Sequence, residues 1–90
     1  VSGNMVSGHI KDKTRQVMEN IKAIIEASGA KMDDVVKTTI YLTNLQDFTA
    51  VNEVYGEYFT EPYPARSTVQ AAALPKGVSV EIDAIAYIGN

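Results

Sequence analysis

The sequence predicts an α+β fold in which two helices pack on one face of a mixed β-sheet. Two segments carry apolar residues at helical spacing, and three segments are rich in β-branched or alternating residues. Their order along the chain is helix, strand, helix, strand, strand, which is typical of helices gathered on one side of a sheet. With 90 residues, we expect residues 1–90 to form a single domain.

The first helix is predicted from Ile10 to Ala30. Its apolar residues recur at spacings of one, three and four and so form one stripe. Ser28 interrupts the stripe, and Gly29 is typical of a helix C-terminus. The preceding residues predict a turn, with His9 in an exposed loop before the helix. The residues of the stripe are Val17, Met18, Ile21, Ile24 and Ile25.

A strand is predicted from Val35 to Leu42, followed by a second helix. Asn44 is expected to cap this helix, which has Asp47 in its first turn and runs to about Phe59. On the strand, one face is expected to carry Val36, Thr38, Ile40 and Leu42. On the helix, the buried stripe is expected to carry Phe48, Val51, Val54, Tyr55 and Tyr58.

The last two strands carry the polar residues of greatest interest. Arg66 lies on the first of them and Glu81 on the second, which runs from Val78 to Tyr87. Because Pro75 and Gly77 favour a tight reversal between them, we expect the two strands to pair antiparallel and to bring Arg66 and Glu81 into one site.

One row of the last strand is uniformly apolar and is expected to face the helices, and the other row is mixed. Leaving the mixed row in water exposes apolar side chains, so we expect self-association through the sheet face that the helices leave uncovered. The apolar row is Val78, Val80, Ile82, Ala84 and Ala86, and the mixed row is Ser79, Glu81, Asp83, Ile85 and Tyr87.

Arg66 and Glu81 suit the chemistry of a small carboxylic acid. A guanidinium is permanently charged and matches a carboxylate, and a nearby Glu orients water or moves a proton. The plain alternatives are a surface ion pair for Arg66 and a solvated side chain for Glu81. Asp83 shares the face of Glu81, and the spacing alone does not single out either carboxylate. Asn52, inside the second helix, is on general grounds a solvated amide.

Composition narrows the classes of function. Eight Lys and Arg face eleven Asp and Glu without a basic cluster, which disfavours nucleic-acid binding. The absence of cysteine excludes thiolate chemistry, and the single histidine predicts neither a metal site nor histidine-based catalysis. No apolar run has the length of a membrane span, and the N-terminus does not read as a signal peptide. We therefore expect a soluble cytoplasmic protein without a cofactor.

Four further motifs join the Arg66 segment in one resemblance. The chain resembles the RidA (YjgF-type) family of enamine/imine deaminases from about Gly3 to its last strand. The resemblance implies a chorismate-mutase-like fold and a homotrimer whose sites lie in clefts between subunits. The segments that carry it are Pro64-Ala65-Arg66-Ser67-Thr68, Val80-Glu81-Ile82-Asp83-Ala84-Ile85, Val36-Lys37-Thr38-Thr39-Ile40-Tyr41-Leu42, Val51-Asn52-Glu53-Val54-Tyr55 and Leu74-Pro75-Lys76-Gly77.

The resemblance also implies roles for particular residues. Arg66 matches the arginine that binds the substrate carboxylate, and Thr68 matches a position, often cysteine in relatives, that offers its backbone N–H to the same group. Glu81 matches the residue that holds the hydrolytic water. Asn52 matches an asparagine at the pocket margin, so the resemblance implies that Asn52 is a substrate-binding residue together with Arg66 and Thr68. Asp83 is then structural.

The implied function is the hydrolysis of 2-imino acids, formed from enamines such as 2-aminoacrylate and 2-aminocrotonate, to 2-oxo acids and ammonia. Two alternatives stay open. One is a regulatory protein that binds 2-oxo acids or related carboxylates without turnover. The other is an endoribonuclease or translation-inhibitor activity, which the acidic balance disfavours.

The N-terminus of the chain lacks two elements that the family has. The family contains a preceding β-hairpin with an aromatic residue and a Ser-Gly-Gln segment that line the pocket, and neither has a match here. Because the chain also opens without an initiator Met, we expect it to be N-terminally incomplete or to start at Met5.

Overall fold

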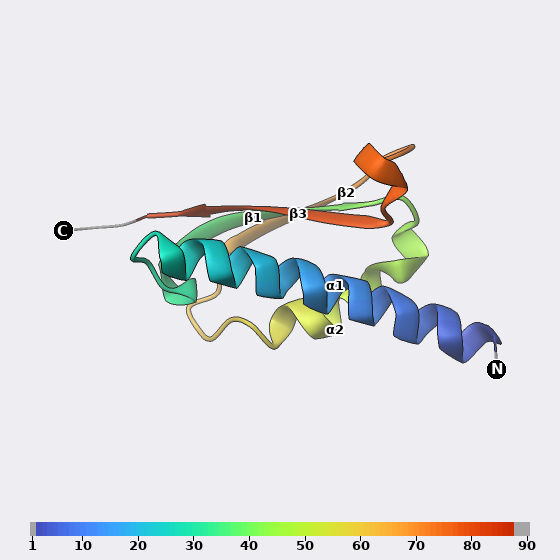
Figure 1. The fold of residues 1–90 in the computed structure, drawn as a ribbon, viewed down its shortest axis with the longest axis horizontal. Helices are drawn as coiled ribbons and strands as arrows, with labels where there is room; N and C mark the ends of the chain where they lie inside the picture. Colours follow the sequence, from blue (N-terminus) through green and yellow to red (C-terminus); the bar gives the residue numbers. More distant parts are fainter. Residues whose placement is uncertain (1, 88–90) are drawn as a thin grey trace.

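A computed structural model describes the backbone of residues 2–87 and the side chains of residues 9–87. Its main elements form one sheet covered by two helices on the same face, as Figure 1 shows. This confirms the predicted fold class. The elements are α1 (Ser2–Ala27), β1 (Val35–Leu42), α2 (Phe48–Gly56), β2 (Ala65–Gln70) and β3 (Val80–Ala86), with short 3₁₀ turns at Met32–Asp34, Leu45–Asp47 and Pro75–Gly77.

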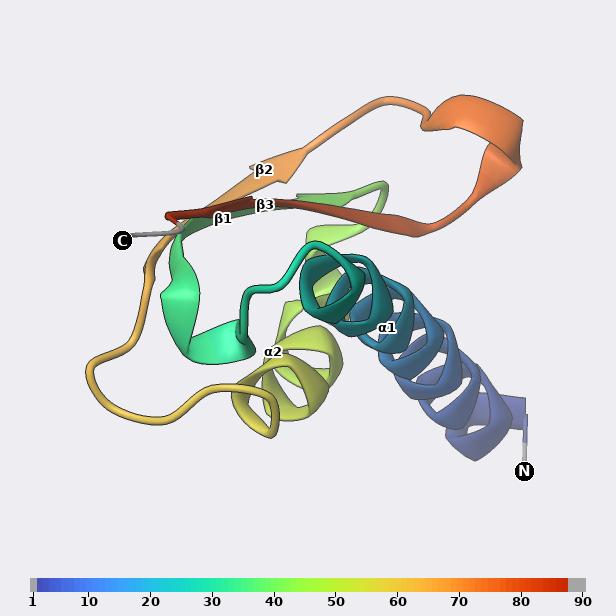
Figure 2. The same cartoon turned by 60° about the vertical axis from the view of Figure 1, so that its left-hand side comes forward.

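The order of the strands corrects one prediction. The sheet has the order β2-β1-β3, with β1 parallel to β2 and antiparallel to β3. The expected direct pairing of the Arg66 strand with the Glu81 strand is therefore wrong. Residues 71–79 form a long excursion beyond the end of β1 (Figure 2), which carries the chain across the central strand. β1 is rich in β-branched residues, which favour the central position of the sheet, where the strand pairs along both of its edges.

A β-bulge changes the faces at the start of β1. The register shifts between Val35 and Lys37, so Val35 is buried and Val36 is 50% exposed. An extra residue in one strand moves neighbouring side chains to the other face. The prediction that Val36 shares a face with the other three residues is therefore wrong, whereas Thr38, Ile40 and Leu42 share one face as expected, and that face is buried.

α1 buries a narrower stripe than predicted. Its buried residues include Thr14, Met18 and Ile25, while Ile24 is 67% exposed and does not belong to the stripe. Ile24 follows Met18 by six residues, which places it about 120° around the helix from the buried line. Thr14 is tolerated in the core because its hydroxyl donates a hydrogen bond to the Ile10 carbonyl at 2.7 Å.

The ends of the elements differ from the predictions by several residues. α1 begins at Ser2, so the exposed His9 lies inside the helix rather than in a preceding loop. Once nucleated, a helix extends through residues of poor propensity because each adds a hydrogen bond, which local composition does not reveal.

The C-terminal signal of α1 is confirmed. Gly29 has a φ of 89° and the Ala30 N–H donates to the Ile25 carbonyl at 3.1 Å, as in a Schellman cap.

Three later boundaries also differ from the predictions. Asn44 caps the 3₁₀ turn that precedes α2, and α2 ends at Gly56 rather than near Phe59. β3 begins at Val80, and Val78 is 41% exposed before it, so Val78 does not face the helices. The excursion that includes Pro75–Gly77 occupies the residues expected to start this strand.

Polar contacts join α1 to α2 and to the residues that directly follow α2. Lys11 lies 2.7 Å from Glu53, Arg15 lies 2.6 Å from Glu57, and the Tyr58 hydroxyl donates to Glu19 at 2.7 Å. The hydrogen bond from Arg15 lowers the pKa of Glu57. Burial, and after it the contact with Glu19, raises the pKa of Tyr58.

None of the described helices is long and apolar enough to cross a membrane.

The Arg15–Glu57 pair predicts a pH-dependent stability. Because the folded protein lowers the pKa of Glu57, the pair contributes its full stability above the ordinary value of 4.5 and loses it as the pH falls through the lowered pKa. We expect Glu57→Gln to lower the thermal midpoint slightly at pH 7, with the difference from wild type vanishing in acid. Melting curves at several pH values check this, with Glu26→Gln as the control. A difference that persists at low pH contradicts it.

Candidate functional site

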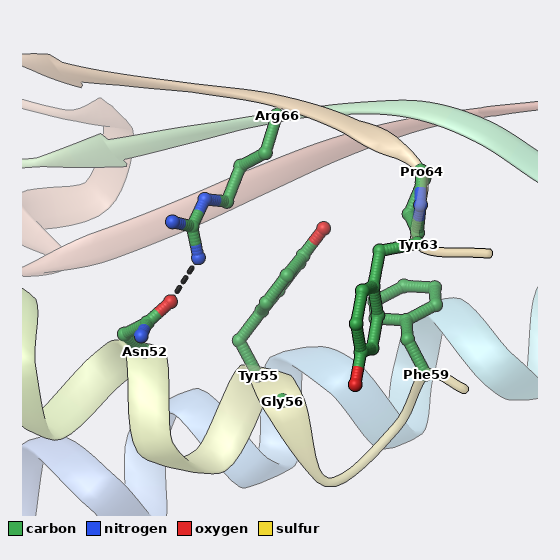
Figure 3. Close-up of a pocket in the computed structure, with 7 residues that line it drawn as sticks. All are labelled: Asn52, Tyr55, Gly56, Phe59, Tyr63, Pro64 and Arg66. Atoms are coloured by element: carbon green, nitrogen blue, oxygen red, sulfur yellow. Dashed lines mark hydrogen bonds between the residues drawn. The ribbon is translucent and has the colours of Figure 1, made fainter. Parts of the chain in front are cut away.

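Arg66 extends from β2 toward α2 rather than toward solvent above the sheet. It pairs with Thr38 of β1, whose side chain is buried under the helices, so both residues share the helix-covered face. A guanidinium Nη1 of Arg66 donates a hydrogen bond to Oδ1 of Asn52, a half-buried residue in the middle of α2 (Figure 3). The structure therefore brings together two of the predicted site residues.

Two aromatic rings of α2 contact the same guanidinium. Its Cζ atom lies 5.3 Å from the ring centroid of Phe48 and 5.4 Å from that of Tyr55, which is the range of cation–π contacts. Tyr55 is itself fixed, because its hydroxyl shares a 2.6 Å hydrogen bond with the buried Thr38 hydroxyl. Arg66 therefore lies against a rigid aromatic wall.

No described carboxylate neutralises Arg66. Among residues 9–87, the ion pairs within 4.0 Å join Lys11 to Glu53 and Arg15 to Glu57, and neither involves Arg66. Its observed partner is the neutral amide of Asn52. A guanidinium has five N–H donors, so most remain available for an anion. The side chain is also exposed, so an anion has access to it.

A cavity of about 410 Å³ opens beside this guanidinium. In Figure 3, Arg66 and Asn52 form one side of it, Phe59, Tyr63 and Pro64 form the other, and Tyr55 stands between. The Tyr55 and Phe59 rings lie 4.8 Å apart. A concave space with a cation at one end and rings at the other suits a small organic anion.

Thr68 does not line this cavity but lies two residues after Arg66 on β2. It pairs with Ile40 of β1 and so shares the face of Arg66. The Ala71 N–H donates to the Leu42 carbonyl of β1 at 2.8 Å. Because backbone groups alternate along a strand, the N–H of Thr68 points to the outer edge of β2. In the described sheet no strand pairs with that edge.

Glu81 is not part of this cavity. It pairs with Tyr41 of β1, whose side chain lies on the uncovered face of the sheet. β1 also separates the Glu81 strand from the Arg66 strand. The prediction that neighbouring strands bring Arg66 and Glu81 into one site is therefore wrong within a single chain, because both the strand order and the face differ. Asp83 shares the uncovered face with Glu81, as expected.

The sequence reasoning missed the residues that surround Arg66. Phe48 and Tyr55 were interpreted only as core residues, and Phe59 and Tyr63 were not connected with a site. The available signal was the spacing of Phe48, Asn52 and Tyr55, which places them on one face of a helix. In the part of the chain that the structure describes, no three acidic or histidine side chains cluster as metal ligands.

The fold and the cavity define a class of small α+β proteins in which one arginine lines a cavity on the helix-covered face of the sheet. Comparison with known proteins gives the family. The family model described as Endoribonuclease L-PSP matches residues 1–88. A RutC family protein of Pyrococcus horikoshii is 57% identical over 86 residues, which cover 96% of this chain and 68% of the relative.

Two further relatives carry names that describe an activity or a ligand. A 2-iminobutanoate/2-iminopropanoate deaminase of Dermatophagoides farinae is 52% identical over 97% of this chain and 68% of its own length. The crystal structure of E. coli TdcF with bound serine is similar with a TM-score of 0.84 and 46% identity, covering 89% of this chain and 65% of TdcF. The chain belongs to the RidA (YjgF-type) family, and it spans about two thirds of the length of these relatives.

Proposed function

We propose that the protein hydrolyses 2-imino acids, which form from enamines such as 2-aminoacrylate, to 2-oxo acids and ammonia. The observation that carries this proposal is the guanidinium of Arg66, which lies in a cavity without a described carboxylate partner. The relative from D. farinae is named for deamination of two such imino acids, and TdcF has bound serine, which also carries a carboxylate.

Arg66 and Thr68 have the chemistry to hold the substrate. The guanidinium of Arg66 donates two parallel hydrogen bonds to the carboxylate, and the edge N–H of Thr68 donates a third. This grip fixes the neighbouring imine carbon in one orientation. Asn52 borders the cavity and keeps Arg66 in place.

Glu81 supplies the water in this proposal. Its carboxylate accepts a hydrogen bond from a water molecule and aims the water oxygen at the imine carbon. Attack forms the new carbon–oxygen bond and moves the imine π electrons to nitrogen, which takes up the proton that the water loses and gives a carbinolamine. Transfer of the carbinolamine hydroxyl proton to nitrogen then breaks the carbon–nitrogen bond while the oxygen forms the C=O bond, releasing ammonia and leaving the 2-oxo acid. The imine carbon is already electrophilic, so positioning and proton handling suffice without a cofactor.

We further propose that the protein is a homotrimer in which each site takes Arg66 from one subunit and Glu81 from the next. A single chain holds these residues on opposite faces of its sheet, so a second copy has to complete the site. The uncovered face also exposes apolar side chains that favour burial, with Ile85 58% exposed and Tyr87 70% exposed. A ring of identical contacts closes such an arrangement.

Residues 1–90 constitute one domain in this proposal, and the protein is cytoplasmic. A single group of buried residues drawn from both helices and the sheet supports the first statement. The absence of cysteine fits the second.

The test of the proposed function is the release of ammonia from enzymatically generated 2-iminobutanoate and 2-iminopropanoate. We expect the protein to release ammonia faster than the spontaneous rate, while its mass in solution corresponds to three copies of the 9.8 kDa chain. A trimer that gives no acceleration overturns the proposal.

That outcome favours a second candidate, a regulatory protein that binds 2-oxo acids without turnover. It draws on the same Arg66 cavity, which needs no contribution from Glu81 to bind a carboxylate. Binding of 2-oxobutanoate without ammonia release distinguishes it. The family description as an endoribonuclease suggests a third activity, which the net charge of −3 does not favour.

A further inference from the structure

Three residues of α2 meet Arg66 from one side. Phe48, Asn52 and Tyr55 are spaced by four and three residues, so they project from the same face of the helix. Two of them offer rings at 5.3 and 5.4 Å from the guanidinium carbon, and Asn52 accepts its hydrogen bond. We call these three residues the α2 clamp.

The α2 clamp is anchored to the rest of the molecule. Tyr55 is buried and its hydroxyl is bonded to Thr38 in the central strand, and Phe48 packs against the hydrophobic core. Val51 and Val54, on the same helix, are completely or almost completely buried. The helix therefore presents the clamp as a fixed surface, against which the long side chain of Arg66 is held.

The acidic residues on α2 and directly after it pair with α1. Glu53 of α2 pairs with Lys11, and Glu57, which follows the last residue of α2, pairs with Arg15. The clamp thus offers Arg66 one neutral oxygen, while these two carboxylates are paired with other cations. A carboxylate in place of Asn52 would occupy and neutralise the guanidinium, and the incoming ligand would have to displace it.

We propose that Asn52 is a positioning residue rather than a substrate contact: it fixes the orientation of Arg66 and, because it is neutral, keeps the charge of Arg66 available, so that the site selects ligands with a carboxylate. The choice of ligand rests on the proposed function, whereas the positioning of Arg66 does not.

The charge part is tested by calorimetric titration with 2-oxobutanoate and its uncharged amide, 2-oxobutanamide. We expect Asn52→Asp to weaken binding of the acid by about tenfold or more, Asn52→Ala to weaken it by about threefold, and neither to alter weak binding of the amide. The control is Asn20→Asp, the same change at an exposed amide on α1 that accepts a bond from Gln16, and we expect less than about a twofold effect. If Asn52→Asp binds the acid as tightly as Asn52→Ala, the claim that the neutrality of Asn52 keeps the charge of Arg66 available is overturned.

The positioning part is tested by nitrogen-15 relaxation of the arginine side chains. The chain contains Arg15 and Arg66 and no other arginine, so two Nε signals report on the whole set. We expect the Nε–H order parameter of Arg66 to be about 0.85 in the wild type and below about 0.6 in Asn52→Ala, with that of Arg15 unchanged.

An Arg66 that is mobile in the wild type, or equally rigid without Asn52, overturns the positioning role. If the wild type fails to bind 2-oxobutanoate, the proposed function fails at its first step and the charge part fails with it. The order parameters still decide the positioning role, because they need no ligand.

Discussion

Replacing Arg66 with alanine is expected to lower kcat/KM for 2-iminobutanoate by at least about 100-fold. Hydrogen bonds to charged groups contribute about 1.5–3 kcal/mol each, and the substitution removes the two that the guanidinium offers to the carboxylate. In the proposed mechanism Arg66 holds the substrate in both the ground state and the transition state, so we expect a higher KM as well as a lower kcat. Steady-state measurement of ammonia release gives both constants.

The chain offers a matched control for this change. Arg15 is the other arginine, is exposed, and pairs with Glu57 away from the cavity. We expect Arg15→Ala to keep kcat/KM within about twofold of wild type, since exposed pairs contribute little. Arg66→Lys is expected to retain part of the binding through charge but to lose the bidentate geometry. Equal activity of the two alanine variants would contradict the role given to Arg66.

Replacing Glu81 with glutamine is expected to lower kcat by about 100-fold to 10,000-fold while KM changes little. The change keeps the shape of the side chain but removes the carboxylate that, in the proposed mechanism, orients water and moves a proton. The substitution leaves Arg66 in place to bind the substrate carboxylate, so substrate binding persists. Steady-state kinetics again separates the two constants.

Asp83→Asn is the control for Glu81, because Asp83 lies on the same face of the same strand two residues away. We expect its kcat to stay within about threefold of wild type, since surface changes away from a site have small effects. A larger loss from Asp83→Asn than from Glu81→Gln would transfer the water-holding role to Asp83.

Local periodicity predicted most of the elements and part of the site. The alternation of β3 correctly placed Ile82 toward the helices and Ile85 on the uncovered face. Thr68 lies on the face of Arg66 as expected. These features depend on the residue periodicity of a strand or a helix, which the pattern of neighbouring residues reveals.

The features that failed depend on contacts between distant segments. The place of β1 between β2 and β3 depends on which strand edges meet, and a reversal signal at Pro75 and Gly77 does not determine that. The bulge near Val36 shifts faces by one residue without a clear signature in the sequence. The α2 clamp was missed because aromatic residues at helical spacing are typical of a core. Its role depends on contact with Arg66, which lies on β2 and is distant in the sequence.

The central claim is that Arg66 and Glu81 act together across two subunits, and mixing two inactive variants tests it most directly. Arg66→Ala and Glu81→Gln chains are unfolded together in equal amounts, refolded, and assayed for ammonia release, with native mass spectrometry to confirm mixed trimers. Each variant alone is expected to be inactive. Random mixing around a ring leaves about one quarter of the sites with an intact Arg66 facing an intact Glu81, so about one quarter of wild-type activity should return. Mixed trimers that remain as inactive as the separate variants would contradict a site shared between subunits.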